Sequence, residues 1–184
     1  MKIADTIINL FNERGEAAYF GEPVSQSEHA LQSAALASHE NAGDSLIIAA
    51  LLHDVGHLLH GESEDVADRG IDAAHEVVTA KWLHSHFGPE VTEPARLHVE
   101  AKRYLCTTDA GYFDGLSPAS QQSFMLQGAR MSADEVIAFE QNPYFRDALR
   151  LRKWDDEAKI PGLEVPPIEA YRSQIESLEL ETAR

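Results

Sequence analysis

The chain has 184 residues, of which 43% are hydrophobic and 25% are charged, and these values are typical of one globular domain with its own core. The formal net charge of −16 argues against a nucleic-acid partner, because an acidic surface repels phosphate backbones. No apolar run is long enough to span a membrane and no signal-type segment opens the chain, so we expect a cytoplasmic protein with no membrane partner. Cys106 is the only cysteine, which excludes internal disulfides and metal sites built from thiolates.

Apolar residues recur at helical spacing along almost the whole chain, and no run alternates in the manner of a strand. The first predicted helix carries four apolar residues at this spacing, Ile3, Ile7, Leu10 and Phe11. Ser25 and Glu28 form the pattern of a capping box and predict the start of a second helix, which ends near residues 41–43. Asp44 is expected to cap a third helix over residues 45–54, which is apolar on nearly every face and therefore central in the core.

The middle of the chain predicts two more helices after a polar segment. Residues 61–70 are expected to form a surface loop, and Asp72 is expected to cap a helix that ends at residues 88–89. Thr92 is predicted to start the next helix, with Pro94 early in its first turn.

Three helices are predicted near the end of the chain from their start signals, which are Ser117-Pro118, a second capping box of Ser132 and Glu135, and the break at Asn142-Pro143. A terminal helix is expected over residues 168–180. Because we find neither an internal repeat nor a linker, the predicted fold class is an all-α, single-domain multi-helix bundle.

The adjacent pair His53-Asp54 lies at the end of the apolar third helix. A carboxylate and an imidazole are costly to bury at such a place unless something pairs with them. A divalent or trivalent cation is the strongest such partner, and this donor set suits iron, manganese or zinc. The alternative is a helix end with two exposed polar residues, and the dipeptide alone does not decide between these interpretations.

Four other residues could complete a metal site with this pair, namely His29, His75, His98 and Asp155. Each of the three histidines lies on a different predicted helix close to apolar positions. A single histidine in such a place is more often a hydrogen-bonded core residue than a ligand, and the aspartate alone is typical of a solvated acid. Only the combination of all six residues in one ordered pattern favours a metal site.

The order His, His-Asp, His, His, Asp along a helical chain resembles the HD superfamily of metalloproteins, and residues 53–57, HDVGH, are similar to its common HDxGH motif. Simple HD phosphatases use only four of these ligands, so the resemblance implies a site for two metals. By resemblance, the first metal would be held by His29, His53 and Asp155, and the second by His75 and His98, with Asp54 as the bridge.

Longer segments resemble a small branch of this superfamily, the mixed-valent diiron oxygenases that cleave organophosphonates, to which myo-inositol oxygenase is more distantly similar. The segments that carry this resemblance are residues 19–26, 96–105, 117–120 and 151–155. The similarity extends over residues 19–161. We therefore expect residues 1–184 to form a single HD domain, with a C-terminal helical tail over residues 162–184.

This resemblance implies two iron ions (Fe2+/Fe3+) as the cofactor and O2 as a co-substrate. The expected substrate is a 1-hydroxy-2-aminoethylphosphonate or its N-trimethylated analogue, and the products are phosphate with glycine or glycine betaine. A C–P bond has no good leaving group for plain hydrolysis, so a redox metal fits this chemistry. The sequence leaves the substituents of the nitrogen and the oligomeric state open.

Two cations are predicted to lie beside the metal ligands. Lys102 follows His98 by four residues and Arg152 precedes Asp155 by three, so each shares a helical face with a ligand. Both could bind a phosphonate, and the planar fork of Arg152 is suited to it. Without the resemblance, they would be ordinary solvated surface cations.

Tyr19 and Glu22 lie on a glycine-containing loop close to the first ligand. The resemblance implies that the tyrosine covers an open iron position until substrate arrives, and that the glutamate gates the loop. We therefore predict catalytic roles for both, together with Lys102 and Arg152. The remaining candidates for substrate contact are Glu28, His57 and Ser120.

Two alternatives stay open from the sequence. An HD phosphohydrolase would use the same metals to activate water against a nucleotide or another phosphate ester, and the same two cations would serve it equally well. A catalytically silent HD domain would only bind or regulate a partner. The six intact ligands argue against this silent module.

Overall fold

The computed structural model describes residues 2–19, 21–60 and 75–180, with only the backbone described at residues 60 and 75–78. Within these ranges the chain is helical without a β-strand, and only two isolated bridges occur, Ala18 with Ser25 and Phe87 with Glu179. The prediction of an all-α fold is therefore confirmed. No helix in these ranges is long and apolar enough to cross a membrane.

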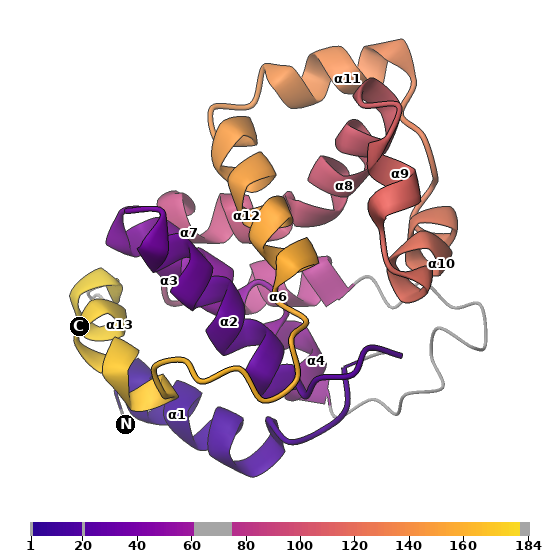
Figure 1. Ribbon diagram of the computed structural model, residues 1–184. Coiled ribbons are helices and arrows are strands. Elements are labelled where there is room, and N and C mark those ends of the chain that lie inside the picture. The colour runs from indigo at the N-terminus through magenta and orange to yellow at the C-terminus, as the bar shows by residue number, and fades with distance from the viewer. Residues whose placement is uncertain (1, 20, 61–74, 181–184) are drawn as a thin grey trace.

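Most of the described helices follow one another with short connections, whereas the loops before α2 and after α12 are longer (Figure 1). In chain order they are α1 (Ile3–Arg14), α2 (Gln26–His39), α3 (Asp44–Leu52), α4 (Val55–His60), α6 (His75–His84), α7 (Pro89–Arg96), α8 (His98–Thr108), α9 (Tyr112–Gly115), α10 (Pro118–Leu126), α11 (Ala133–Glu140), α12 (Phe145–Glu157), the 3-10 helix η1 (Ile168–Tyr171) and α13 (Arg172–Leu178).

The core is organised around α3, which is buried at every position from Leu46 to Leu52. It packs against α2, α7, α12 and α13, and α1 and α13 lie together at one end of the molecule (Figure 1). At the other end, α8, α11 and α12 enclose a smaller apolar cluster that includes Leu97 and Phe139. Because α12 belongs to both parts, residues on it can reach the centre of the molecule.

The predicted caps of three helices are confirmed. Ser25 and Glu28 close a capping box at the start of α2, and Ser132 and Glu135 do the same for α11. Ser117 caps α10 through its side chain. The side chain of each serine accepts the backbone N–H three residues later, which satisfies an amide that the helix itself leaves without a partner.

Two predicted helix starts are wrong. Asp44 is the first residue of α3 rather than its cap, and Gly43 takes the cap position. Thr92 lies inside α7, which begins after Gly88 and ends before a separate α8. The hydroxyl of Thr92 donates to the carbonyl of Gly88 over 3.1 Å, so it bonds back along a helix that has already begun and cannot act as its N-cap.

Two further differences concern the helix inventory. The sequence pattern did not indicate α4 or α9, which have only six and four residues and are too short to show a period. The predicted terminal helix is divided into η1 and α13 and ends at Leu178. The predicted cap at Asp72 lies outside the described residues.

Candidate metal centre

Separate segments of the chain bring nitrogen and oxygen donors to one buried point. The five residues come from α2, from the junction between α3 and α4, from the start of α8 and from α12, and they are His29, His53, Asp54, His98 and Asp155. Their exposed fractions lie between 0% and 7%. The donors therefore form a polar cluster inside the core, where every charge needs compensation.

The Nε2 atoms of the histidines face the carboxylates. His29 Nε2 lies 3.2 Å from His53 Nε2 and 3.5 Å from Asp155 Oδ1. Asp54 Oδ2 lies 3.4 Å from His53 Nε2, whereas Asp54 Oδ1 lies 3.5 Å from His98 Nε2. One ligand atom from each of His29, His53 and Asp54 lies within 4.8 Å of the other two. The cluster is therefore small enough to surround a cation.

The other nitrogen of each ring is held by a backbone carbonyl. The Nδ1 atoms lie 2.9, 2.8 and 2.6 Å from their acceptors, and the pairs are His29 with Ala158, His53 with Ala50, and His98 with Ala95. A carbonyl can only accept a hydrogen bond, so each Nδ1 carries a proton and each Nε2 is the atom left to bind a metal or a second proton. This is the arrangement that prepares a histidine to bind a metal.

The close approach of His29 and His53 fits a cation between them. With both Nδ1 atoms protonated, two lone pairs face each other over 3.2 Å, and only a proton or a metal relieves that repulsion. Burial lowers the pKa of His29 to about 4. Burial also acts on His53, but the carboxylate of Asp54 outweighs it and raises the pKa of His53 to about 9. A metal would replace the proton that His53 otherwise keeps.

Arg152 lies behind Asp155. It donates to Asp155 Oδ2 over 2.6 Å and to Asp156, and its Nε donates to the hydroxyl of Tyr112 over 3.3 Å. Although burial opposes the shift, Arg152 lowers the pKa of Asp155 far below its usual value. The guanidinium therefore keeps Asp155 ionised and fixed in orientation, and its predicted contact with substrate stays a prediction.

Tyr19 covers the cluster from the loop between α1 and α2. Its hydroxyl donates to Asp54 Oδ2 over 2.9 Å, and its ring stacks on His29 with centroids 3.9 Å apart. Gly21 has a φ of 71°, a left-handed conformation that glycine adopts without strain. The loop thus turns sharply enough to place the phenol over the metal ligands.

A second chain of polar contacts follows α10. Lys102 is 3% exposed, and its Nζ donates to Ser123 Oγ over 2.7 Å. One turn earlier, Ser120 Oγ accepts from Lys159 Nζ over 3.0 Å, and Lys159 also pairs with Glu22 Oε1 at 2.9 Å. Burial lowers the pKa of Lys102 to about 7, so an anion bound beside it would favour the ammonium form.

The remaining predicted site residues are Glu28, His57 and His75. Glu28 uses its carboxylate at the start of α2, where it accepts from the backbone of Ser25 and of Gly162. His57 is half-buried on α4, the helix that directly follows His53 and Asp54. His75 is the first residue of α6, and its side chain lies outside the described part of the structure.

The structure adds residues that the sequence did not single out as site residues. Lys159, Tyr112, Asp156 and Ser123 all contact a predicted site residue. The spacing of Asp156 from Arg152, at four residues on a helix, could have indicated that pair. The other three contacts join distant parts of the chain and leave no local signal.

Residues 27–139 match the family described as HD domain. The chain belongs to the HD-domain family. It is 47% identical over 176 residues to hydroxymethylphosphonate dioxygenase from Gimesia maris, an alignment that spans 94% of the chain and 86% of that protein. It is also 40% identical over 164 residues to [1-hydroxy-2-(trimethylamino)ethyl]phosphonate dioxygenase (glycine-betaine-forming) from Leisingera caerulea, with 89% and 84% covered.

A third relative is the uncharacterized protein L432 of Acanthamoeba polyphaga mimivirus, which is 35% identical over 171 residues, with 92% of the chain and 78% of that protein covered. The predicted membership of the HD superfamily and of its phosphonate-oxidising branch is confirmed by these matches. The HD fold and the buried His/Asp cluster together indicate metal binding at this site.

We expect His29→Ala and His53→Ala each to lose most of the bound metal, because each removes a nitrogen donor whose lone pair faces the cluster. Metal content per chain, measured by elemental analysis after purification, checks this. His39→Ala is the matched control, since His39 is exposed at the end of the same helix as His29. Wild-type metal content in both ligand variants would contradict the assignment.

Proposed function

We propose that the chain is a diiron dioxygenase that uses O2 to cleave the C–P bond of a 1-hydroxyphosphonate and releases phosphate. The observation that carries the proposal is the convergence of histidine Nε2 atoms on Asp54 and Asp155, under Tyr19 and beside the buried Lys102. The names of two relatives support it, because both are phosphonate dioxygenases. Candidate substrates are hydroxymethylphosphonate and the 2-amino or 2-trimethylammonio derivatives of 1-hydroxyethylphosphonate.

In this proposal, His29, His53 and Asp155 would hold one iron, His75 and His98 would hold the other, and Asp54 would be shared between them. The bridge is supported by the two oxygens of Asp54, since Oδ2 lies nearest His53 and Oδ1 faces His98. Bound iron would supply the one-electron redox chemistry that reaction with O2 requires. Only nitrogen and oxygen donors are present, which suits iron.

The protein's own groups bind and orient the substrate in this proposal. The ammonium of Lys102 donates to a phosphonate oxygen, and its burial makes that contact stronger than it would be in water. Arg152 holds Asp155 as a carboxylate in one orientation. Tyr19 shields the cluster from solvent until the substrate displaces it.

Three further features belong to the same proposal. Residues 1–184 act as one domain, which is supported by the packing of α13 on α1 and α3. The protein works in the cytoplasm on a small molecule. The net charge of −16 supports the view that nucleic acid is not a partner.

The principal alternative is an HD phosphohydrolase, which would use the same ligands to activate water. It is less well supported, because the two named relatives that match most of the chain are dioxygenases. The two reactions differ in one measurable requirement. A dioxygenase consumes O2 with its substrate, whereas a hydrolase does not.

We expect the iron-loaded protein to release phosphate from at least one of the three hydroxyphosphonates only when O2 is present, with matching O2 uptake. Phosphate release and oxygen consumption in sealed aerobic and anaerobic vessels check this. A generic phosphate ester under both conditions serves as the control. Equal phosphate release with and without O2 would instead identify a hydrolase.

We expect Lys102→Met to raise the KM for the phosphonate by about one to two decades, the effect of losing one charge-assisted contact of roughly 1.5–3 kcal/mol. Iron content should stay unchanged, because Lys102 binds Ser123 and not the metal ligands. Lys153→Met is the control, since Lys153 is exposed on α12. An unchanged kcat/KM in Lys102→Met would remove Lys102 from the phosphonate site.

We expect Tyr19→Phe to keep turnover but to oxidise faster in air when substrate is absent. The variant loses the hydroxyl that bonds Asp54, so the ring is held over the cluster only by stacking on His29. Optical and paramagnetic resonance spectra of the iron pair, followed over time in air, check this. If the spectra and the oxidation rate match the wild type, Tyr19 does not protect the site.

A further inference from the structure

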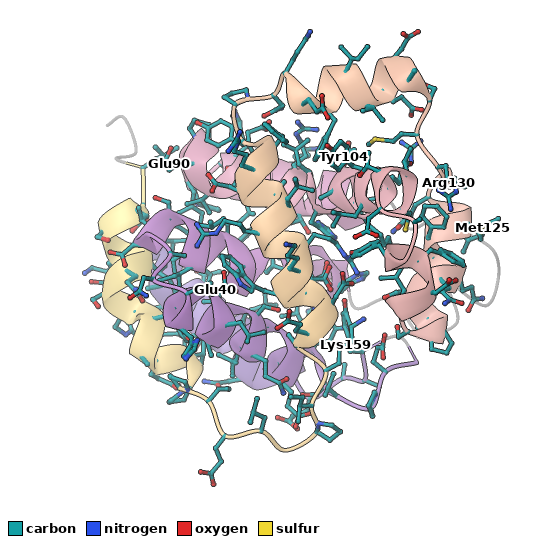
Figure 2. All side chains as sticks on the ribbon, turned by 45° about the horizontal axis from the view of Figure 1, so that its top comes forward. Glu40, Glu90, Tyr104, Met125, Arg130 and Lys159 are labelled. Atoms are coloured by element: carbon teal, nitrogen blue, oxygen red, sulfur yellow. The ribbon has the colours of Figure 1, made fainter. Side chains whose placement is uncertain are left out.

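Lys159 and Glu22 form a shielded ion pair at the loop between α1 and α2, which covers the His/Asp cluster. Lys159 Nζ lies 2.9 Å from Glu22 Oε1, and Ser117 Oγ donates to the same oxygen over 2.5 Å. The two charged side chains are only 12% and 8% exposed, so solvent screens their attraction little. Figure 2 shows Lys159 beyond the end of α12, beside the loop that precedes α2. The negative charge of Glu22 is therefore already compensated.

This ion pair is connected to groups that touch the cluster. Lys159 directly follows Ala158, whose carbonyl holds Nδ1 of His29. The backbone N–H of Glu22 donates to the carbonyl of Tyr19 over 2.8 Å, and the hydroxyl of Tyr19 reaches Asp54. A charge at the pair therefore acts at the rim of the metal site.

The same pair lies next to the proposed phosphonate contact. Ser120 binds Lys159, and Ser123, one helical turn later on α10, binds Lys102. A phosphonate bound by Lys102 would therefore lie about one helical turn along α10 from the ion pair. With the phosphonate at Lys102, the substituent on C1 is the part of the substrate that can extend toward the ion pair.

Among the described residues, the three candidates from the loop before α2 and from α2 that could receive a positive nitrogen there already have partners. The carboxylate of Glu28 is bonded to the backbone of Ser25 and of Gly162. The ring of Tyr19 stacks on His29 with an interplanar angle of 15°. Because Glu22 is paired with Lys159, an incoming ammonium group would have to displace a lysine or lie beside its like charge.

We propose that Lys159 determines specificity, and that it makes the enzyme prefer a hydroxyphosphonate whose C1 substituent is uncharged, such as hydroxymethylphosphonate, over one that carries an amino or trimethylammonio group. This inference rests on the proposed function. It assigns the choice among related substrates to one ion pair outside the metal ligands.

The test uses the iron-loaded full chain and three ligands, hydroxymethylphosphonate, 2-amino-1-hydroxyethylphosphonate and its N-trimethyl analogue. Dissociation constants are measured by calorimetry without O2, and kcat/KM is measured from phosphate release with O2. The variants are Lys159→Gln, which removes the charge but keeps a polar chain, and Lys159→Arg, which keeps the charge. Lys153→Gln removes the same charge from an exposed position of α12.

We expect the wild type to bind and turn over hydroxymethylphosphonate best. Lys159→Gln should shift the selectivity toward the two cationic ligands by about tenfold, the size expected for one charge-assisted contact. Lys159→Arg and Lys153→Gln should keep the wild-type selectivity. In a Glu22→Gln background, Lys159→Gln should bring no such shift, because the carboxylate that it would release is absent.

Two results would overturn the inference, a wild type that prefers a cationic ligand, or a selectivity that Lys159→Gln leaves unchanged. Failure of the proposed function gives a different pattern. In that case the ligands bind but none releases phosphate with O2, and the dissociation constants still test Lys159. Circular dichroism spectra of each variant confirm that the compared proteins are folded.

Discussion

The placement of three imidazole lone pairs and two carboxylates at one point inside a helical core is the constraint on which the rest of this structure depends. Such a cluster is unstable in an apolar interior unless a cation occupies it. The fold uses backbone groups to orient the histidines toward such a cation, because the carbonyls of Ala50, Ala95 and Ala158 each fix one ring. Three helices therefore have to meet at the same place, and α3 at the centre of the core provides the fixed reference.

The residues around the cluster have separate roles. Arg152 keeps Asp155 ionised and is itself held by Asp156 and Tyr112. Tyr19 has a different role, since it covers the donors and contacts Asp54 from the loop between α1 and α2.

The proposed substrate contact depends on a different element, α10, whose serines join Lys102 and Lys159 to one helix. The first lysine is buried and suited to an anion, whereas the second is used to neutralise Glu22. Relatives with the same fold are named for phosphonates with and without a trimethylamino group. A change at one ion pair beside the candidate metal site is a simple physical route to such a difference, because it leaves the candidate ligands untouched.

The amino-acid sequence by itself determined the helical class and the capping boxes, and it predicted the ordered set of candidate ligands from His29 to Asp155. These features are local or linear: a capping box needs only Ser25 and Glu28, and a helical period is visible within one segment. Only the tertiary structure decided which groups hold those ligands. Backbone carbonyls have no sequence signature, and Lys159 and Glu22 are 137 positions apart, so their pairing exists only because the packing of α12 against α2 brings the end of α12 to the loop before α2.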